Sequence, residues 1–108
     1  MNHTIYRRPR VIQDLNQQYA YYLLHGGDEL AERYLNQVEE TLARLLEQPK
    51  IGARRDLPNP QAAGLRMQRV RSFDHEFIYY RPREDGIELF RVLRDQQNVL
   101  DILEEEIS

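Results

Sequence analysis

Arginine is concentrated in one part of this 108-residue chain, in a pattern typical of a binding surface. Residues 49–83 carry seven arginines and Lys50 against three acidic residues, although the net charge of the whole chain is −3. Arginine makes planar, two-pronged contacts with carboxylates and phosphates, so the cluster favours an acidic protein surface or a nucleic acid as partner. Alternatively, the cluster neutralises the chain's own acidic tail, which carries Asp101, Glu104, Glu105 and Glu106.

Composition argues against several other kinds of chemistry. The chain has no cysteine, which excludes disulfides and thiolate metal sites, and its histidines, His3, His25 and His75, are too scattered to predict a metal centre. We therefore expect neither a metal nor a cofactor. No segment approaches the roughly 20 apolar residues of a membrane span, and the charged N-terminus lacks the apolar run of a signal peptide. These features predict a cytoplasmic protein with one domain over residues 1–108 and no membrane partner.

Two amphipathic helices are predicted in the first half of the chain. Apolar residues recur at helical spacing over residues 10–24, after Pro9, and the segment HGGD at residues 25–28 ends this helix and begins a second one that Pro49 ends. The short link predicts an antiparallel helical hairpin. We expect the hairpin to pack on a sheet through Leu15, Tyr19, Tyr34, Val38, Leu42 and Leu45.

The apolar period changes from about 3.6 to about 2 after residue 64, which predicts strands. A first strand is expected at residues 3–8, and strands at 65–71, 76–82 and 87–94 form an antiparallel meander, followed by a short helix over 98–108. Tyr79 and Tyr80 point to opposite faces of their strand, so we expect one in the core and one exposed. The order of elements predicts a two-layer α+β fold.

Several segments, in this order, resemble the ParE/RelE superfamily of type II toxins, and the ParE branch more closely. The most specific are LLEQPKIGARR at residues 45–55, GLR at 64–66, IYYR at 78–81 and RVL at 91–93. The resemblance implies a toxin that a cognate antitoxin holds inactive in an oligomeric complex. ParE-like members poison DNA gyrase, whereas RelE-like members cleave messenger RNA on the ribosome.

The residues favour the gyrase-binding branch over the ribonuclease branch. Metal-independent RNA cleavage needs a base, an acid and cations for the phosphorane charge. RelE-like members often supply a tyrosine or histidine near the C-terminus, but neither follows Val92 here, and Arg94 stands where the family often has histidine. The alternative ribonuclease would use Arg66, His75 and Arg91, with His75 expected on a turn between strands. We therefore interpret the chain as an inhibitory binding protein rather than an enzyme.

The arginines divide into two predicted groups. For the target, the resemblance and the position of the last strand suggest Arg91 and Arg94 within residues 91–103, together with Arg54 and Arg55. For an extended, acidic antitoxin segment, we expect Arg66, Arg69 and Arg71 to provide the contacts. Arg91 has an alternative, purely internal role, which is an ion pair with Glu88 or Asp95.

Overall fold

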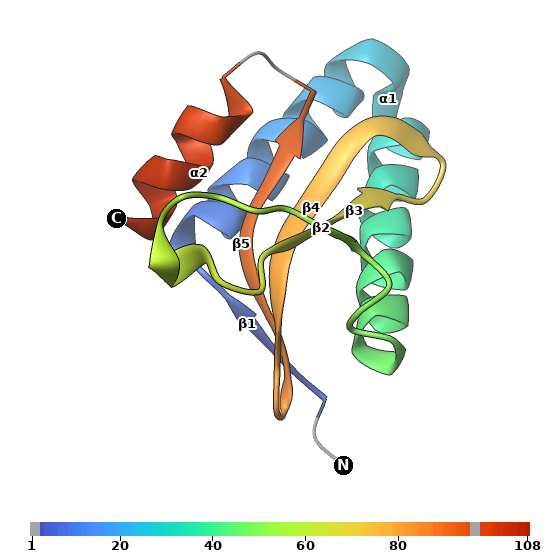
Figure 1. Ribbon diagram of the computed structural model, residues 1–108. Helices are drawn as coiled ribbons and strands as arrows, with labels where there is room; N and C mark the ends of the chain where they lie inside the picture. The colour runs from blue at the N-terminus through green and yellow to red at the C-terminus, as the bar shows by residue number, and fades with distance from the viewer. Residues whose placement is uncertain (1–2, 96–97) are drawn as a thin grey trace.

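The computed structural model, which describes residues 3–95 and 98–108, has the predicted α+β fold (Figure 1). A five-stranded sheet has the strand order β1-β5-β4-β3-β2. Its elements are β1 (Thr4–Arg7), α1 (Pro9–Glu47), β2 (Ala53–Arg54), a 3-10 turn (Pro60–Ala62), β3 (Arg66–Val70), β4 (Phe73–Arg83), β5 (Gly86–Arg94) and α2 (Val99–Ile107). The predicted antiparallel meander is β3-β4-β5.

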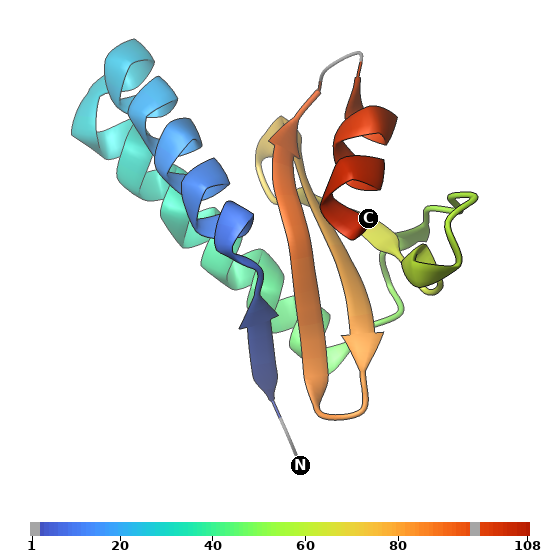
Figure 2. The same cartoon turned by 90° about the vertical axis from the view of Figure 1, so that its left-hand side faces the viewer.

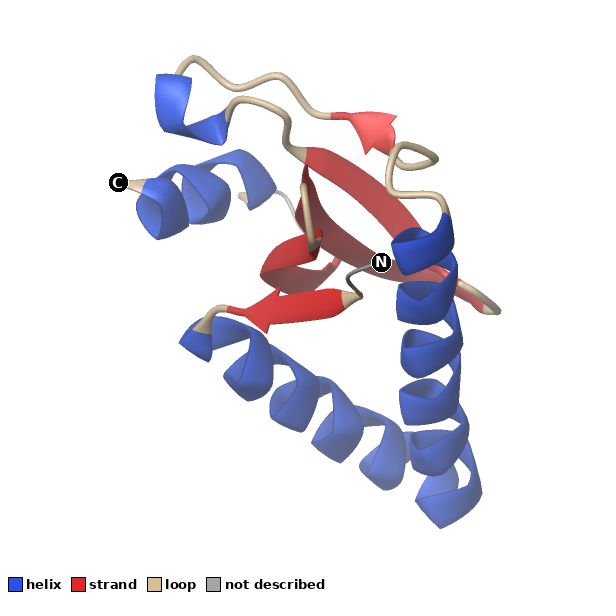
Figure 3. Cartoon of the chain, turned by 90° about the horizontal axis from the view of Figure 1, so that it is seen from below, coloured by secondary structure: helices blue, strands red, loops and turns tan. Residues whose placement is uncertain are grey.

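The element α1 consists of two helices that meet directly at Gly27, whose backbone is not helical, so no longer loop separates them. Gly27 has φ of 74° and ψ of −171°, a conformation that glycine adopts without steric cost. We name residues 9–26 the first limb and residues 28–47 the second limb. Figures 2 and 3 show that the limbs run back from the bend and diverge, with the sheet packed on one side of the pair.

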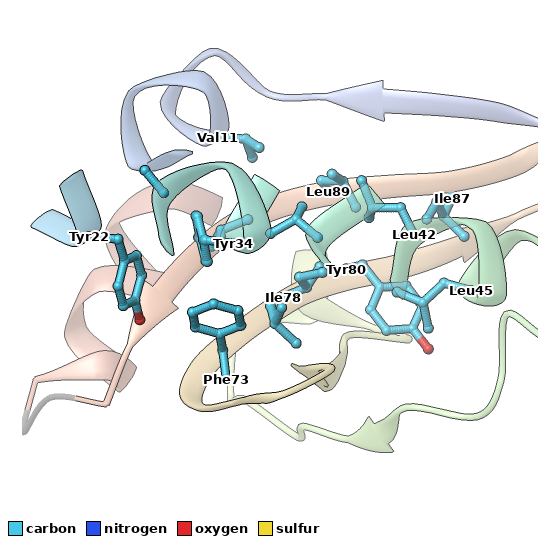
Figure 4. Close-up of a cluster of buried hydrophobic side chains, with 14 residues drawn as sticks. Val11, Tyr22, Tyr34, Leu42, Leu45, Phe73, Ile78, Tyr80, Ile87 and Leu89 are labelled. Carbon is cyan, nitrogen blue, oxygen red and sulfur yellow. The ribbon is translucent and has the colours of Figure 1, made fainter. Parts of the chain in front are cut away.

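The main core lies between α1 and the sheet (Figure 4). Of the predicted packing residues, Tyr34, Val38, Leu42 and Leu45 are fully buried, whereas Leu15 and Tyr19 are partly buried and pack against the same cluster. From the sheet, the cluster receives Val70, Phe73, Ile78, Tyr80, Ile87, Leu89 and Val92. The predicted packing of the hairpin on the sheet is therefore confirmed.

The opposite face of the sheet is also covered, which corrects the expectation for Tyr79 and Tyr80. Both are buried, Tyr80 beneath α1 and Tyr79 in a second cluster with Phe90, Leu103 and Ile107. The expectation was wrong because α2 and the segment around Ala62 pack on this second face.

The two edges of the sheet end differently. The β1 strand pairs in parallel with only the first part of β5, up to Leu89. Beyond it, Asp14 Oδ2 accepts a hydrogen bond from Val92 N (3.0 Å) and Gln18 Nε2 donates one to Val92 O (3.0 Å), so side chains of the first limb replace a strand.

At the other edge, β2 is a two-residue strand within a segment that the sequence predicted to consist of turns. It pairs only with Arg66 and Met67. Within residues 3–95 and 98–108, no strand pairs with the outer edge of β3 from Gln68 to Val70. This open edge is a place where an added strand can hydrogen-bond.

Candidate functional site

Arg66 holds the loop that follows α1 through hydrogen bonds to the backbone of that loop. Its Nη1 donates hydrogen bonds to the carbonyl oxygens of Lys50 (3.1 Å) and Gly52 (2.8 Å). Tyr80 fixes the same loop, since its hydroxyl donates to Pro49 O (2.6 Å) and accepts from Gly52 N (3.0 Å). Burial raises the pKa of Tyr80, which keeps the hydroxyl protonated as a donor. Arg66 therefore shapes the loop beside the open edge.

Arg91 is buried, and its partner is neither of the two acids considered from the sequence. Its Nε and Nη2 each lie 2.8 Å from a carboxylate oxygen of Asp14, an ion pair with two parallel hydrogen bonds. Both side chains are more than 90% buried, and the hydrogen bond with Asp14 raises the pKa of Arg91. In this arrangement, the guanidinium of Arg91 is not exposed for contact with another protein.

Arg69 lies in β3 beside the open edge, and Arg71 follows directly after the end of this strand. Both side chains are exposed to solvent. They line a groove of about 510 Å³ between the second limb and β3, together with Thr41, Arg44 and Ile51. Arg71 N donates to Thr41 Oγ1 (3.1 Å), which fixes the end of β3 against the second limb. The Arg71 guanidinium lies 4.0 Å from Glu40 in a solvent-exposed pair, which contributes little to stability. The groove thus combines unpaired backbone with accessible cations.

The structure separates Arg54 and Arg55 from Arg94. Arg54 lies in β2 at one edge of the sheet, where its exposed guanidinium is 3.4 Å from Asp56. Arg55 follows directly, and its buried Nε has no hydrogen-bond partner among the described residues. Arg94 ends β5, with β4 and β3 between it and β2. The four residues predicted to bind the target therefore do not form one surface.

Arg94 is anchored in a buried polar network at the bend end of α1. Its Nη1 donates to the hydroxyl of Tyr22 (2.7 Å) and lies 3.4 Å from Glu76 Oε2. Tyr22 and Tyr34, one from each limb, donate to the two oxygens of Glu76 at 2.9 and 3.0 Å. Glu76 is fully buried, and sequence reasoning did not identify it. One carboxylate thus joins both limbs to β4 and β5.

The pKa of Glu76 is raised by burial, which outweighs the lowering effect of its hydrogen bonds from Tyr22 and Tyr34 and of Arg94. A raised pKa in the folded state means that the folded protein binds this proton more tightly than the unfolded chain. The stability that Glu76 contributes is therefore fully present at pH values below 4.5, the ordinary pKa of its carboxyl group. This stability is lost as the pH rises through the pKa of Glu76 in the folded protein.

We predict that the free energy of unfolding of the wild type, relative to Glu76→Gln, falls as pH rises above 4.5. The slope reaches at most about 1.4 kcal/mol per pH unit for one proton. Urea unfolding of both proteins at several pH values measures it. A difference that increases with pH would show instead that hydrogen bonding dominates and that the pKa of Glu76 is lowered.

His75 lies within β4, not on the turn where the sequence placed it, because β4 begins at Phe73. Its exposed ring is paired with Asp95, with 3.2 Å between Nδ1 and Oδ2. Arg66 holds the loop after α1, and Arg91 holds Asp14. The three residues of the ribonuclease alternative therefore do not converge on one site.

Among the described residues, no acidic residue of the tail forms an ion pair with an arginine of the cluster. Glu106 binds Arg8, with 3.2 Å between Oε2 and Nη1. From the cluster, Arg81 and Arg83 pair with Glu88 of β5.

The predicted target segment 91–103 also includes residues 96–97, which lie outside the described residues. Within the described ranges, no helix is apolar enough over sufficient length to cross a membrane, and no three potential metal ligands gather.

Comparison with known proteins defines the class of protein. Residues 5–99 match the family model described as the ParE toxin of the type II toxin–antitoxin system parDE. The chain belongs to this family of toxins, as the sequence resemblance predicted. A solved structure of the chromosomal ParDE toxin–antitoxin system from P. aeruginosa has a similar fold, with a TM-score of 0.69 at 20% identity over 87% of this chain and 97% of that one. No curated protein matches the chain.

Proposed function

We propose that this ParE-family toxin acts in the cytoplasm by inhibiting DNA gyrase, and that a cognate antitoxin neutralises it. Family membership over residues 5–99 supports the toxin role. The observation that carries the proposed target contact is Arg94, which is held at the end of β5 by Tyr22 and Glu76 while its side chain keeps 31% of its surface exposed. An anchored cation loses little conformational entropy when it binds an acidic partner.

The target is tested with purified gyrase holoenzyme in a supercoiling assay. We expect the wild type to inhibit supercoiling and to accumulate cleaved DNA complexes, and Arg94→Gln to need at least about tenfold more protein, the loss typical of a hot-spot residue. Arg83→Gln, which changes an exposed arginine at the opposite end of the β4–β5 hairpin, is the matched control and should keep its potency.

Melting curves must accompany this assay, because Glu76 loses its cationic neighbour in Arg94→Gln. If concentrated wild-type protein leaves supercoiling unchanged, gyrase is not the target. Primer extension on translating ribosomes then tests the RelE-like alternative, for which codon-specific cuts are the expected sign.

For the antitoxin, we propose the groove between β3 and the second limb as its binding site. An extended segment pairs with the open edge at Gln68–Val70, places apolar side chains beside Ile51, and directs acidic side chains to Arg69 and Arg71. Arg66 contributes indirectly, since it holds the loop that carries Ile51.

We predict that replacing Arg69 and Arg71 together by alanine weakens antitoxin binding, and more strongly at low salt than at high salt. Both cations are solvent-exposed, so salt already screens part of their attraction in the wild type. Isothermal titration with a cognate antitoxin measures the effect, with Arg83→Ala as a control distant from the groove. Equal affinity of the double variant and the wild type would exclude this site.

A further inference from the structure

A second pocket, of about 340 Å³, lies at the bend end of α1. We name it the tip pocket, and its lining includes Tyr21, Tyr22, His25, Phe73, His75 and Arg94. The same end of the first limb carries apolar side chains that face solvent, of which Leu24 is 83% exposed. Arginine and tyrosine are among the residues enriched where protein interfaces gain most of their affinity.

Among the described residues, the guanidinium of Arg94 is hydrogen-bonded through Nη1 only. Its Nη1 contacts Tyr22 and Glu76, and within the described part of the chain nothing hydrogen-bonds to its Nε or Nη2. Its Cζ lies 4.2 Å from the ring centroid of Tyr21, and that ring stacks on His25 with 4.1 Å between centroids. The stack fixes the plane of the guanidinium, so its unused donors are available at the pocket.

The charges around the pocket favour one kind of anion. Two parallel donors of a guanidinium match a carboxylate. Asp74 also lines the pocket, and Asp95 pairs with His75, so a phosphate, with its larger charge, meets more repulsion than a carboxylate does. The exposed Leu24 adds apolar contact area that a protein surface uses.

We propose that the tip pocket is a protein-binding site in which Arg94 receives an acidic side chain of the toxin's target, with Tyr21 and Leu24 packing around it. This inference rests on the proposed toxin function, and it does not require the target to be gyrase. The tip pocket also adjoins the antitoxin groove, because Ser72 and Asp74 line both. An antitoxin that extends past Ser72 therefore covers the target site.

The first test is growth arrest on expression without antitoxin. Leu24→Asp and Tyr21→Ala should each reduce toxicity at least about tenfold with unchanged melting, whereas Asn16→Asp, also exposed on the first limb, should leave toxicity unchanged. Asp74→Asn should increase toxicity, since it removes a negative charge beside the incoming carboxylate. Full toxicity in the Leu24 and Tyr21 variants, or a wild type that is not toxic, overturns the proposal.

The second test identifies the contact with gyrase holoenzyme. A photoreactive phenylalanine at position 24 should crosslink to a gyrase subunit, and the same group at position 16 should not. Inhibition of gyrase without this crosslink, and with full potency of Leu24→Asp, rejects the tip pocket while leaving the proposed function intact. Direct binding of a labelled DNA duplex that is lost in Arg94→Gln overturns the carboxylate assignment in favour of phosphate.

Discussion

Asp14→Ala is expected to lower the free energy of unfolding by about 3–5 kcal/mol, because it leaves the buried Arg91 cation without its partner. It also removes the side-chain acceptor for Val92 N, so this hydrogen bond at the edge of β5 is lost together with the ion pair. Urea unfolding at neutral pH measures the change. For a protein of this size, such a loss is a large fraction of the total stability.

A double-mutant cycle separates the ion pair from the packing. Asp14→Leu combined with Arg91→Met removes both charges, so the double variant should lose less stability than Asp14→Leu alone. If the two single losses simply add, Arg91 and Asp14 do not interact in solution as they do in the structure. That result would return Arg91 to the set of candidate target contacts.

Leu42→Asp is expected to prevent folding, because Leu42 is fully buried between the second limb and the sheet. An unpaired carboxylate there costs several kcal/mol of desolvation in addition to the lost apolar contacts. Circular dichroism and size-exclusion chromatography should show an unfolded or aggregated protein.

The neighbouring substitution Ala43→Asp is the matched control, since Ala43 faces solvent on the same turn of the helix and the helix propensities of the two variants are comparable. It should melt close to the wild type. A Leu42→Asp protein that is soluble and melts cooperatively would contradict the packing of α1 on the sheet.

The sequence was sufficient to predict the helices and the meander, because each depends on a local pattern. The period of 3.6 set the apolar face of α1, and the two glycines set its bend. The second covered face was not predicted, because whether Tyr79 is buried depends on where α2 packs, and no local pattern encodes that position. The two-residue strand β2 was missed for a similar reason, since its pairing with β3 is its only sign.

The burial of the acidic residues Glu76 and Asp14 could have been predicted from the sequence, but their partners could not. Glu76 has the same parity as Ile78 and Tyr80, which places its side chain on the buried face of β4, and Asp14 lies three residues after the buried Val11. Those spacings mark a buried acid. They do not identify its partner, because Asp14 and Arg91 are 77 residues apart in the chain and meet only after α1 packs along β5.

The unequal edges of the sheet limit how copies of this toxin can assemble. Beyond Leu89, Asp14 and Gln18 occupy the hydrogen-bonding groups of Val92, so on this side of the sheet a strand can add only beside the four-residue strand β1. The open edge at Gln68–Val70 can accept one added strand, after which that site is saturated. A strand added there occupies the edge at which a second copy of the toxin would otherwise pair.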